Sequence, residues 1–402
     1  MQPLDGTMNY GQVLAEIDAN EKIIARMEEA LARGADWLCS NLAPNGPITG
    51  EKRVSFCHKV SWGLYEAGRI DECFRILDWL ASEARRAPAE YYFDGEPAFD
   101  KDMQRIYRFL TFGKVAEWLR HDGIANDEER EGACRYQHSS GGVFANIDNG
   151  KEGALEPLNT SFFGQYALAA GMMDRAIDVG EWLCELVEMN EQYLKQDQPV
   201  FYYKRDSESG ELIIDFTADQ EMNFIIKPDK IKQPSWVPGT IVSILMILYR
   251  ETGGQRYLDA SLKLADYEAK TDYAQLYWPS KCKAAWGFAD LYAITGDPLH
   301  RRLSGDVNRV TFLSAQKTEG AWDGMYYPLA EDGPWRKVVY QGPNKNVPES
   351  LPEDGSWGWL SGYEITGEFM GEMGTSIKRF REVLARLRRR KSDLENELQL
   401  AD

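Results

Sequence analysis

Six segments of the chain are apolar on nearly every side, and most of them precede a helix that has only one apolar face. A helix that is hydrophobic all round must be buried on all sides, whereas a helix with one apolar stripe faces water on its back. The alternation therefore predicts inner helices covered by outer helices such as Arg69–Ala84 and Gln255–Lys270. The predicted inner helices are Arg53–Ala67, Lys101–Trp118, Leu158–Gly171, Trp236–Gly253, Lys281–Gly296 and Gly362–Thr375.

A repeated turn joins the two kinds of helix. Four predicted inner helices end in a similar tripeptide, namely Glu66-Ala67-Gly68, Ala169-Ala170-Gly171, Glu251-Thr252-Gly253 and Ile294-Thr295-Gly296. Glycine readily adopts the left-handed conformation that closes a helix. Self-similarity on this scale is typical of repeat architectures, because one hairpin cannot bury its apolar face alone. We therefore expect an all-α fold, an (α/α)6 toroid of six helical hairpins around a central cavity.

The helical pattern runs without a Pro-, Ser- or Gly-rich linker, so we expect a single domain over residues 1–402. Two long insertions, 190–235 and 323–361, interrupt the pattern on the rim where the inner helices begin. Structured loops on one rim of a ring usually form binding walls or lids. Segment 376–398 is strongly charged and is either a solvated outer helix or a dimer contact.

The first insertion contains a strand signal. Pro199–Lys204 and Leu212–Phe216 have strand-like composition and flank the turn-forming sequence Glu208-Ser209-Gly210-Glu211. This arrangement predicts a small β-hairpin near 199–216.

Charge and composition exclude several partners. The 46 basic and 64 acidic residues give a net charge of −18, which opposes binding to nucleic acid or to an anionic membrane. No apolar run reaches the roughly 18 to 20 residues that span a bilayer, and Met1–Tyr10 lacks the features of a signal peptide.

The six cysteines are scattered singly, which is typical of reduced core thiols. We expect a cytoplasmic protein that acts on a small molecule, with a homodimer possible.

The starts of the inner helices are the first place to seek chemistry. If these helices run parallel, their N-termini meet at one mouth, and each contributes a partial positive charge and free N–H groups. Asp100 and Asp102 open the second inner helix. They are either N-caps or carboxyl groups that face an apolar chamber, where desolvation raises the pKa and creates a proton donor. His58 is either a satisfied core residue or a group that relays a proton.

Other residues at these ends are candidates for binding a substrate. Asn159 and Glu364 lie near the starts of the third and sixth inner helices. Lys281 and Lys283 place positive charge at a helix N-terminus, which requires a compensating carboxylate or an anionic group on the substrate. Asp219 and Glu221, just upstream of the fourth inner helix, are candidates for that carboxylate. Aromatic residues on inner helices are either core or cavity lining, and we select Trp62, Tyr107, Trp236 and Trp286.

Familiar cofactor motifs do not occur. The sequence has no GxxxxGK[ST], no GxGxxG between a strand and a helix, no HExxH, no GxSxG and no Cys/His cluster. We therefore expect no nucleotide, flavin or catalytic metal as cofactor.

Two stretches share a spacing of Gln, Gly and an aromatic residue that resembles the QW repeat of triterpene cyclases and of protein prenyltransferase β-subunits. They are Tyr136-Gln137 with Gly141-Gly142-Val143-Phe144, and Gln316 with Gly320-Ala321-Trp322. In that superfamily the Gln and the aromatic ring tie an outer helix to the turn that follows. The resemblance implies the same toroid and covers under a tenth of the chain.

A second resemblance concerns the predicted proton donor. Asp100-Lys101-Asp102-Met103 is similar to the DxDD motif of class II terpene cyclases, with Met103 in place of the last Asp. The resemblance implies that Asp102 corresponds to the residue that protonates the substrate. The loops Asp323–Tyr327 and Trp357–Trp359 are loosely similar to loops of sugar epimerases and unsaturated glucuronyl hydrolases on the same ring.

Our hypothesis is a cofactor-independent acid–base cyclase, isomerase or dehydratase that acts on an apolar terpenoid or polyene-like molecule. Asp102 would donate the proton, Asp100 and His58 would set its pKa, and aromatic rings would stabilise positive charge. One alternative is a carbohydrate-active enzyme, a sugar epimerase or a glycoside hydrolase or lyase. Another is a binding protein without catalysis. A cavity wall that is mainly aliphatic and aromatic would favour the terpenoid hypothesis. Five or more hydrogen-bonding side chains that converge on the cavity would favour a sugar as the substrate.

Overall fold

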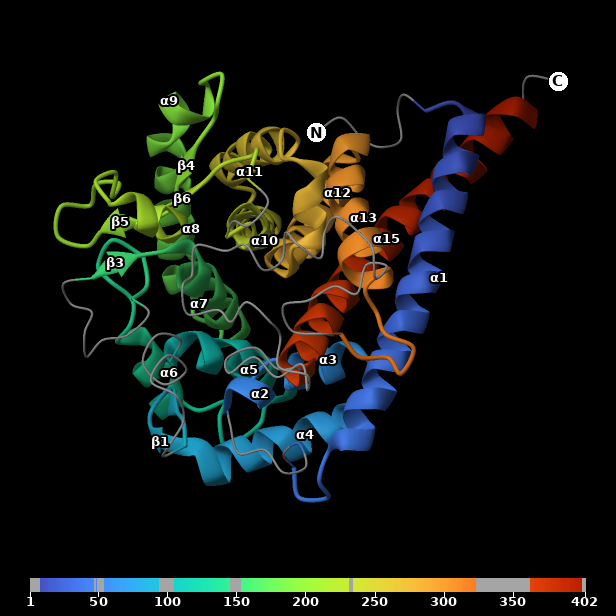
Figure 1. The fold of residues 1–402 in the computed structure, drawn as a ribbon. Helices are drawn as coiled ribbons and strands as arrows, with labels where there is room; N and C mark the ends of the chain where they lie inside the picture. Colours follow the sequence, from blue (N-terminus) through green and yellow to red (C-terminus); the bar gives the residue numbers. More distant parts are fainter. Residues whose placement is uncertain are drawn as a thin grey trace.

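The computed structural model describes residues 8–46, 48, 54–93, 105–144, 153–230, 234–322 and 362–399. Helices dominate this part of the chain and form two concentric layers (Figure 1). Insertion 323–361 and the segment that holds Asp100 and Asp102 lie outside the described residues.

The inner layer is a closed ring of helices. Each inner helix contacts the next, and the last contacts the first. As the apolar pattern predicts, these helices are buried on all sides; α5, for example, buries every residue from Arg105 to Glu117. The inner helices are α2 (Val54–Cys57) with α3 (Val60–Glu66), α5 (Arg105–Leu119), α7 (Pro157–Ala169), α10 (Trp236–Thr252), α12 (Ala284–Thr295) and the first part of α15 (Gly362–Gln399).

The outer layer consists of amphipathic helices. In α4, Cys73, Ile76 and Leu77 are buried against the ring, whereas Asp71 and Asp78 face water. Figure 1 shows α1, α4, α8 and α11 on the outside of the ring. The outer helices are α1 (Tyr10–Asn41), α4 (Ile70–Trp79), α6 (Asp127–Cys134), α8 (Met173–Met189), α11 (Gln255–Glu268) and α13 (Pro298–Asp306), which continues into the π-helix η6 (Val307–Leu313).

The two ends of the chain close the ring together. Helix α15 contacts α12 on one side and α3 on the other, so the last inner helix joins the first. Its outer partner is α1, which packs along α15 at the edge of the molecule (Figure 1). The charged segment 376–398 is the continuous extension of α15. The sixth helical pair therefore combines the two ends of the described chain.

The predicted glycine turns occur as expected. Gly253 and Gly296 end α10 and α12 with φ of 71° and 69°, and their N–H groups donate to the carbonyl oxygens of Tyr249 and Tyr292. Gly68 and Gly171 have φ of 74° and 75°. A left-handed residue of this kind satisfies carbonyl groups that the helix end would leave unpaired.

Short strands and short helices lie in the connections between the helices of the ring. Three antiparallel two-stranded sheets pair β1 (Arg85–Ala87) with β2 (Glu90–Tyr91), β3 (Ala154–Leu155) with β5 (Arg205–Asp206), and β4 (Phe201–Tyr202) with β6 (Ile225–Ile226). The remaining short helices are η1 (Leu80–Ala84), α9 (Glu191–Leu194), η3 (Ala218–Asn223), η4 (Tyr273–Tyr277) and η5 (Pro279–Lys283).

The β-hairpin predicted near 199–216 is present but shorter than expected. Arg205 lies opposite Leu212 in an antiparallel bridge, and the N–H groups of Asp206 and Ile213 donate across it to Glu211 and Lys204. Of the first predicted strand only Lys204 takes part in this hairpin, because Phe201–Tyr202 pairs with Ile225–Ile226 instead. A later segment competes for that strand, which local turn signals cannot reveal.

The two QW-like motifs tie outer helices to neighbouring elements in the same way. The side-chain amide of Gln316 donates to the carbonyl oxygens of Ala30 on α1 and Gly320, and Trp322 Nε1 donates to the carbonyl of Phe312. The amide of Gln137 likewise donates to the carbonyl of Arg175 on α8, 3.0 Å away. Each glutamine therefore joins the end of one outer helix to the next hairpin. Among the described helices, none is long and apolar enough to cross a membrane.

Candidate functional site

Ionisable side chains from four inner elements meet inside the ring, and we call them the inner cluster. Glu364, Glu368 and Glu372 recur every fourth residue, so they lie on one face of α15. Tyr107 comes from α5, Lys283 from η5, and the His58–Lys59 turn separates α2 from α3. The members of the inner cluster, all buried, are His58, Lys59, Tyr107, Lys283, Glu364, Glu368 and Glu372.

Glu368 is the centre of the inner cluster. Lys59 Nζ lies 2.8 Å from Glu368 Oε2 and 2.7 Å from Glu364 Oε1, so one ammonium group bridges two carboxylates. Lys283 forms an ion pair with the other oxygen of Glu368, and the Tyr107 hydroxyl donates to that same oxygen over 3.5 Å. Buried charges are tolerated when they are paired in this way.

Mutual pairing fixes the charge of three of these groups. Burial opposes the charged forms of Lys59 and Lys283, yet the neighbouring acidic groups raise the pKa of both above the usual range. Burial also opposes ionisation of Glu368, but the two ammonium groups lower its pKa below the usual range. The ion triplet therefore stays charged at neutral pH.

Glu364 differs from its neighbour because it can change charge near neutral pH. Burial raises its pKa to about 7, although the ammonium group of Lys59 acts in the opposite direction. His58 Nε2 lies 3.7 Å from Glu364 Oε1. A carboxyl group with a pKa near the working pH is suited to accept and return a proton. Glu364 and His58 therefore form a candidate acid–base pair.

Glu372 extends the inner cluster deeper into the ring. Its carboxylate lies 3.7 Å from Lys283 Nζ, and burial together with the negative charge of Glu368 raises its pKa above the usual range. Two ammonium groups thus face three carboxyl groups, and burial of a surplus negative charge is costly. The inner cluster consequently retains a proton at neutral pH on Glu364 or Glu372.

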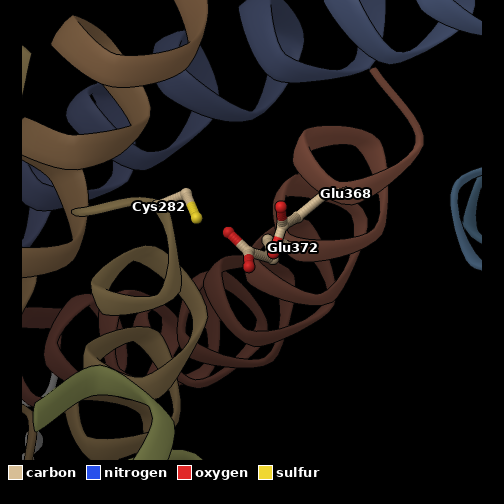
Figure 2. Close-up of side chains that lie close together, drawn as sticks. All are labelled: Cys282, Glu368 and Glu372. Atoms are coloured by element: carbon tan, nitrogen blue, oxygen red, sulfur yellow. The ribbon is translucent and has the colours of Figure 1, made fainter. Parts of the chain in front are cut away.

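Cys282, Glu368 and Glu372 also have the donor atoms of a metal site. One ligand atom of each lies within 4.8 Å of the others, and Figure 2 shows the Cys282 sulfur directed toward the Glu372 carboxylate. The Lys283 ammonium group, however, is paired with Glu368 and lies 3.8 Å from the Cys282 sulfur. A cation placed among these donors would have to displace that lysine. The donor set fits an internal ion pair better than a divalent metal.

Another buried lysine, which is not a member of the inner cluster, lies among aromatic rings. Lys114 Nζ is 3.6 Å from the ring centroid of Trp62, 4.8 Å from that of Phe162 and 5.2 Å from that of Trp286. It donates to Gln165 Oε1 at 3.0 Å, and burial lowers its pKa to about 7. Rings that we predicted would stabilise positive charge on a substrate therefore already surround an amine of the protein.

The remaining predicted site residues have different surroundings. Asn159 N and Nδ2 donate to Glu156 Oε1, so its amide completes the N-cap of α7. Trp236 is only partly buried, and its ring packs edge-on against Tyr203, with centroids 5.7 Å apart. Asp100 and Asp102 lie outside the described residues.

The side chains of Lys281 and Lys283 have different partners, although the two residues are close in sequence. Lys281 pairs with Glu268 at the end of α11 and donates to Gln275 Oε1 at 3.1 Å, whereas Lys283 reaches into the inner cluster. The expected carboxylate partner of Lys281 is therefore present, and it is Glu268. Glu221 pairs with Lys227 instead, and the side chain of Asp219 lies outside the described part of the chain. The outer helix α11 supplies this carboxylate, and the order of residues in the sequence does not reveal that Glu268 lies close to Lys281.

Sequence reasoning missed Lys59, Lys114, Glu368 and Glu372 as site residues. Each is a charged residue within a segment that is otherwise apolar on nearly every side. Such a residue must be buried and therefore paired. The spacing of four between the glutamates was a usable signal, because it places them on one helix face.

Comparison with solved structures identifies proteins of the same fold. D-mannose isomerase has a TM-score of 0.61 and 11% identity, covering 88% of this chain and 97% of that chain. The α-1,6-mannanase from Salegentibacter sp. HEL1_6 has a TM-score of 0.52 and 12% identity, covering 88% and 99%. A type II terpene cyclase from Scytonema has a TM-score of 0.51 and 9% identity, covering 89% and 99%.

These similarities establish the fold. The chain is an (α/α)6 toroid, as the sequence predicted. Identities this low establish the fold alone. No protein-family model and no curated protein sequence matches the chain.

Proposed function

We propose that the protein is a carbohydrate-active enzyme that isomerises or epimerises a monosaccharide by acid–base chemistry in the inner cluster. The observation that carries this proposal is the convergence of six hydrogen-bonding side chains, which are His58, Lys59, Tyr107, Lys283, Glu364 and Glu368. A sugar offers a hydroxyl group on almost every carbon, and its recognition requires such a set of convergent polar groups.

The charges of the inner cluster suit a proton transfer beside a carbonyl group. Glu364, once ionised, would accept the proton from C2 of an open-chain aldose. The electron pair of that C–H bond would move into the C1–C2 bond, and negative charge would develop on the carbonyl oxygen. A permanently charged ammonium group such as Lys59 stabilises that oxygen. Return of the proton to C1, together with transfer of the O2 hydroxyl proton to O1, gives a ketose, and protonation of C2 from the opposite face together with protonation or release of O1 as the aldehyde gives an epimer.

The structural neighbours lend support to a carbohydrate substrate. The neighbour with a TM-score of 0.61 is an isomerase of D-mannose, and the mannanase acts on an α-1,6-linked mannan. Both act on mannose or its polymers, which makes D-mannose the first substrate to test.

A terpenoid substrate remains the second candidate. The type II terpene cyclase was solved with its substrate, geranylgeranyl dihydroxybenzoate, and supports a reaction of this class on the same fold. Asp102 stays the predicted proton donor in that case. The amine of Lys114 weighs against this candidate, because it already occupies the space beside Trp62, Phe162 and Trp286.

The direct test is proton exchange in deuterated water. The purified protein is incubated with D-mannose and other aldohexoses, and the C2 proton is followed by NMR. We expect loss of the C2–H signal and formation of a ketose or an epimer. Parallel incubations with an α-1,6-mannotriose and with geranylgeranyl dihydroxybenzoate test hydrolysis and cyclisation. Turnover of either one, with no exchange in any aldohexose, would refute the proposal.

Substitution of Glu364 tests whether this residue is the base that accepts the C2 proton. Glu364→Gln keeps the shape of the side chain but cannot accept a proton, so kcat/KM should fall by about 10²- to 10⁴-fold. The wild-type kcat/KM should rise with pH through about 7, where Glu364 ionises, and this dependence should vanish in the variant. Glu29→Gln, an exposed change on α1, is the control. Exchange at the wild-type rate in folded Glu364→Gln protein would exclude this residue as the base.

A further inference from the structure

A hollow of about 620 Å³ lies outside the ring, between α1 and α13 and beside α15. We call it the α1–α13 hollow. Its volume is in the range of pockets that hold small molecules. One wall carries Arg301, Arg302 and Arg309, and the opposite side includes Ile23 of α1 and Phe380 of α15. None of its lining residues belongs to the inner cluster.

The charge of this hollow is opposite to that of the whole chain. Three arginines and a single acidic residue, Asp306, line it, whereas the chain as a whole carries a charge of −18. Arg309 donates to Asp306 at 2.8 Å, and Arg301 lies 3.3 Å from Glu16. Arg302 has neither an ion pair nor a side-chain hydrogen bond with any described residue. Its positive charge is therefore available to a ligand.

Two polar atoms beside the hollow have unused hydrogen-bonding capacity. Asn20 is 1% exposed, and its Oδ1 has no hydrogen-bond partner among the described residues. The buried Nε of Arg301 also has none there. A buried polar atom without a partner costs free energy, which a ligand with a matching donor or acceptor would recover. Ile23, Leu299 and Phe380 add an apolar surface to the same hollow.

We propose that the α1–α13 hollow binds a small organic anion that has an apolar body, such as a carboxylate, sulfonate or phosphate ester attached to a ring system. The anionic group would pair with Arg302 at the open side. The apolar body would lie against Ile23, Leu299 and Phe380, and a donor group on the ligand would reach Asn20 Oδ1. This site is independent of the chemistry proposed for the inner cluster.

The test uses two fluorescent probes that differ only in charge. 8-Anilinonaphthalene-1-sulfonate has the ring system and an anionic group, and N-phenyl-1-naphthylamine has the same rings without the sulfonate. Each probe is titrated into the native protein, and the dissociation constant is measured by fluorescence. The anionic probe should bind at least about fivefold more tightly than the neutral one, as expected for an exposed charge pair.

Two variants locate the binding. Arg302→Gln should weaken the anionic probe about fivefold and leave the neutral probe unchanged. Gly305 lines the hollow, and a Cβ there would meet nothing within 4 Å, so Gly305→Leu should fill part of the space and weaken both probes. Arg120→Gln removes an exposed arginine on another hairpin and should change neither constant. Circular dichroism verifies that each variant is folded.

The outcomes are distinguishable. Weaker binding in both hollow variants, with normal binding in Arg120→Gln, supports the proposal. Unchanged binding of the anionic probe in Gly305→Leu would show that it binds elsewhere, for instance inside the ring, and would overturn the proposal. Equal affinity for the two probes would refute the anionic specificity.

Discussion

Two buried lysines show how local partners decide the behaviour of a single residue. Lys59 bridges two carboxylates, which raise its pKa above the usual range. Lys114 has an amide and four aromatic rings as neighbours, and burial lowers its pKa to about 7. Aromatic rings attract a cation but do not replace the hydration that burial removes. The first lysine is therefore a fixed charge and the second a titrating amine.

Replacement of Lys114 by Met should remove a pH dependence of stability. Lys114 has a pKa of about 7 in the fold, against 10.5 for an ordinary lysine. Between these values the unfolded chain binds one proton more than the folded chain, so the free energy of unfolding rises with pH. The slope is about 1.4 kcal/mol per pH unit. Below pH 7 both states are protonated and this contribution is constant.

Urea unfolding at pH 7, 8 and 9 measures this effect. The wild type should gain about 2 kcal/mol relative to Lys114→Met between pH 7 and 9. Lys22→Met, at an exposed position on α1, should follow the wild type. Parallel curves for wild type and Lys114→Met would mean that the amine keeps its ordinary pKa in the fold.

At the scale of elements, the inner helices approach each other through glycine. A Cβ at Gly239 of α10 would overlap the carbonyl oxygen of Lys283 and the amide nitrogen of Ala284, and one at Gly287 of α12 would overlap the carbonyl of Gly239. Backbone atoms cannot move aside as a flexible side chain can. The glycines therefore set the distance between α10 and α12, and with it the position from which Lys283 reaches Glu368.

Gly239→Ala should destabilise the protein by about 1–3 kcal/mol, because the added methyl group forces the two helices apart. The same change at Gly305 is the matched control. There the Cβ meets nothing within 4 Å, so alanine should stabilise the helix by about 1 kcal/mol. Thermal and urea unfolding of both variants measure the difference. A stable Gly239→Ala protein would show that the contact between α10 and α12 is not tight.

At the scale of the whole molecule, closure of the ring makes the two ends of the chain depend on each other. Helix α15 contacts α3 and α12, and α1 packs along it. In an open array of repeats the terminal units have a neighbour on one side only. Here every inner helix has neighbours on both sides, which favours unfolding as one unit.

We therefore predict a single cooperative unfolding transition, consistent with one domain. Tryptophans on α1, α3, α8 and α12 report on distant parts of the ring. The urea midpoint from their fluorescence should coincide with the midpoint from far-UV circular dichroism. Gly34→Ile, which would press α1 against Met370 of α15, should lower both midpoints together. Two separated midpoints would instead indicate independently folding parts.

The sequence alone determined the toroid. Burial on all sides leaves its mark on every position of an inner helix, so periodicity distinguished inner from outer helices, and the glycine turns located the hairpins. It also supplied His58, Glu364 and Lys283 as candidates, because their positions at the starts of inner helices follow from the same pattern.

Only the tertiary structure decided which charges meet. Lys59, Lys283 and Glu368 come from elements that lie far apart in sequence, and their pairing depends on how the ring closes. The partners of Lys281 and Lys283 also depend on the packing, since Lys281 pairs with Glu268 on an outer helix and Lys283 pairs with Glu368 in the inner cluster. A hydrophobic pattern records whether a position is buried, but a pKa depends on which charges lie within a few ångströms, and that distance is set only when the helices pack.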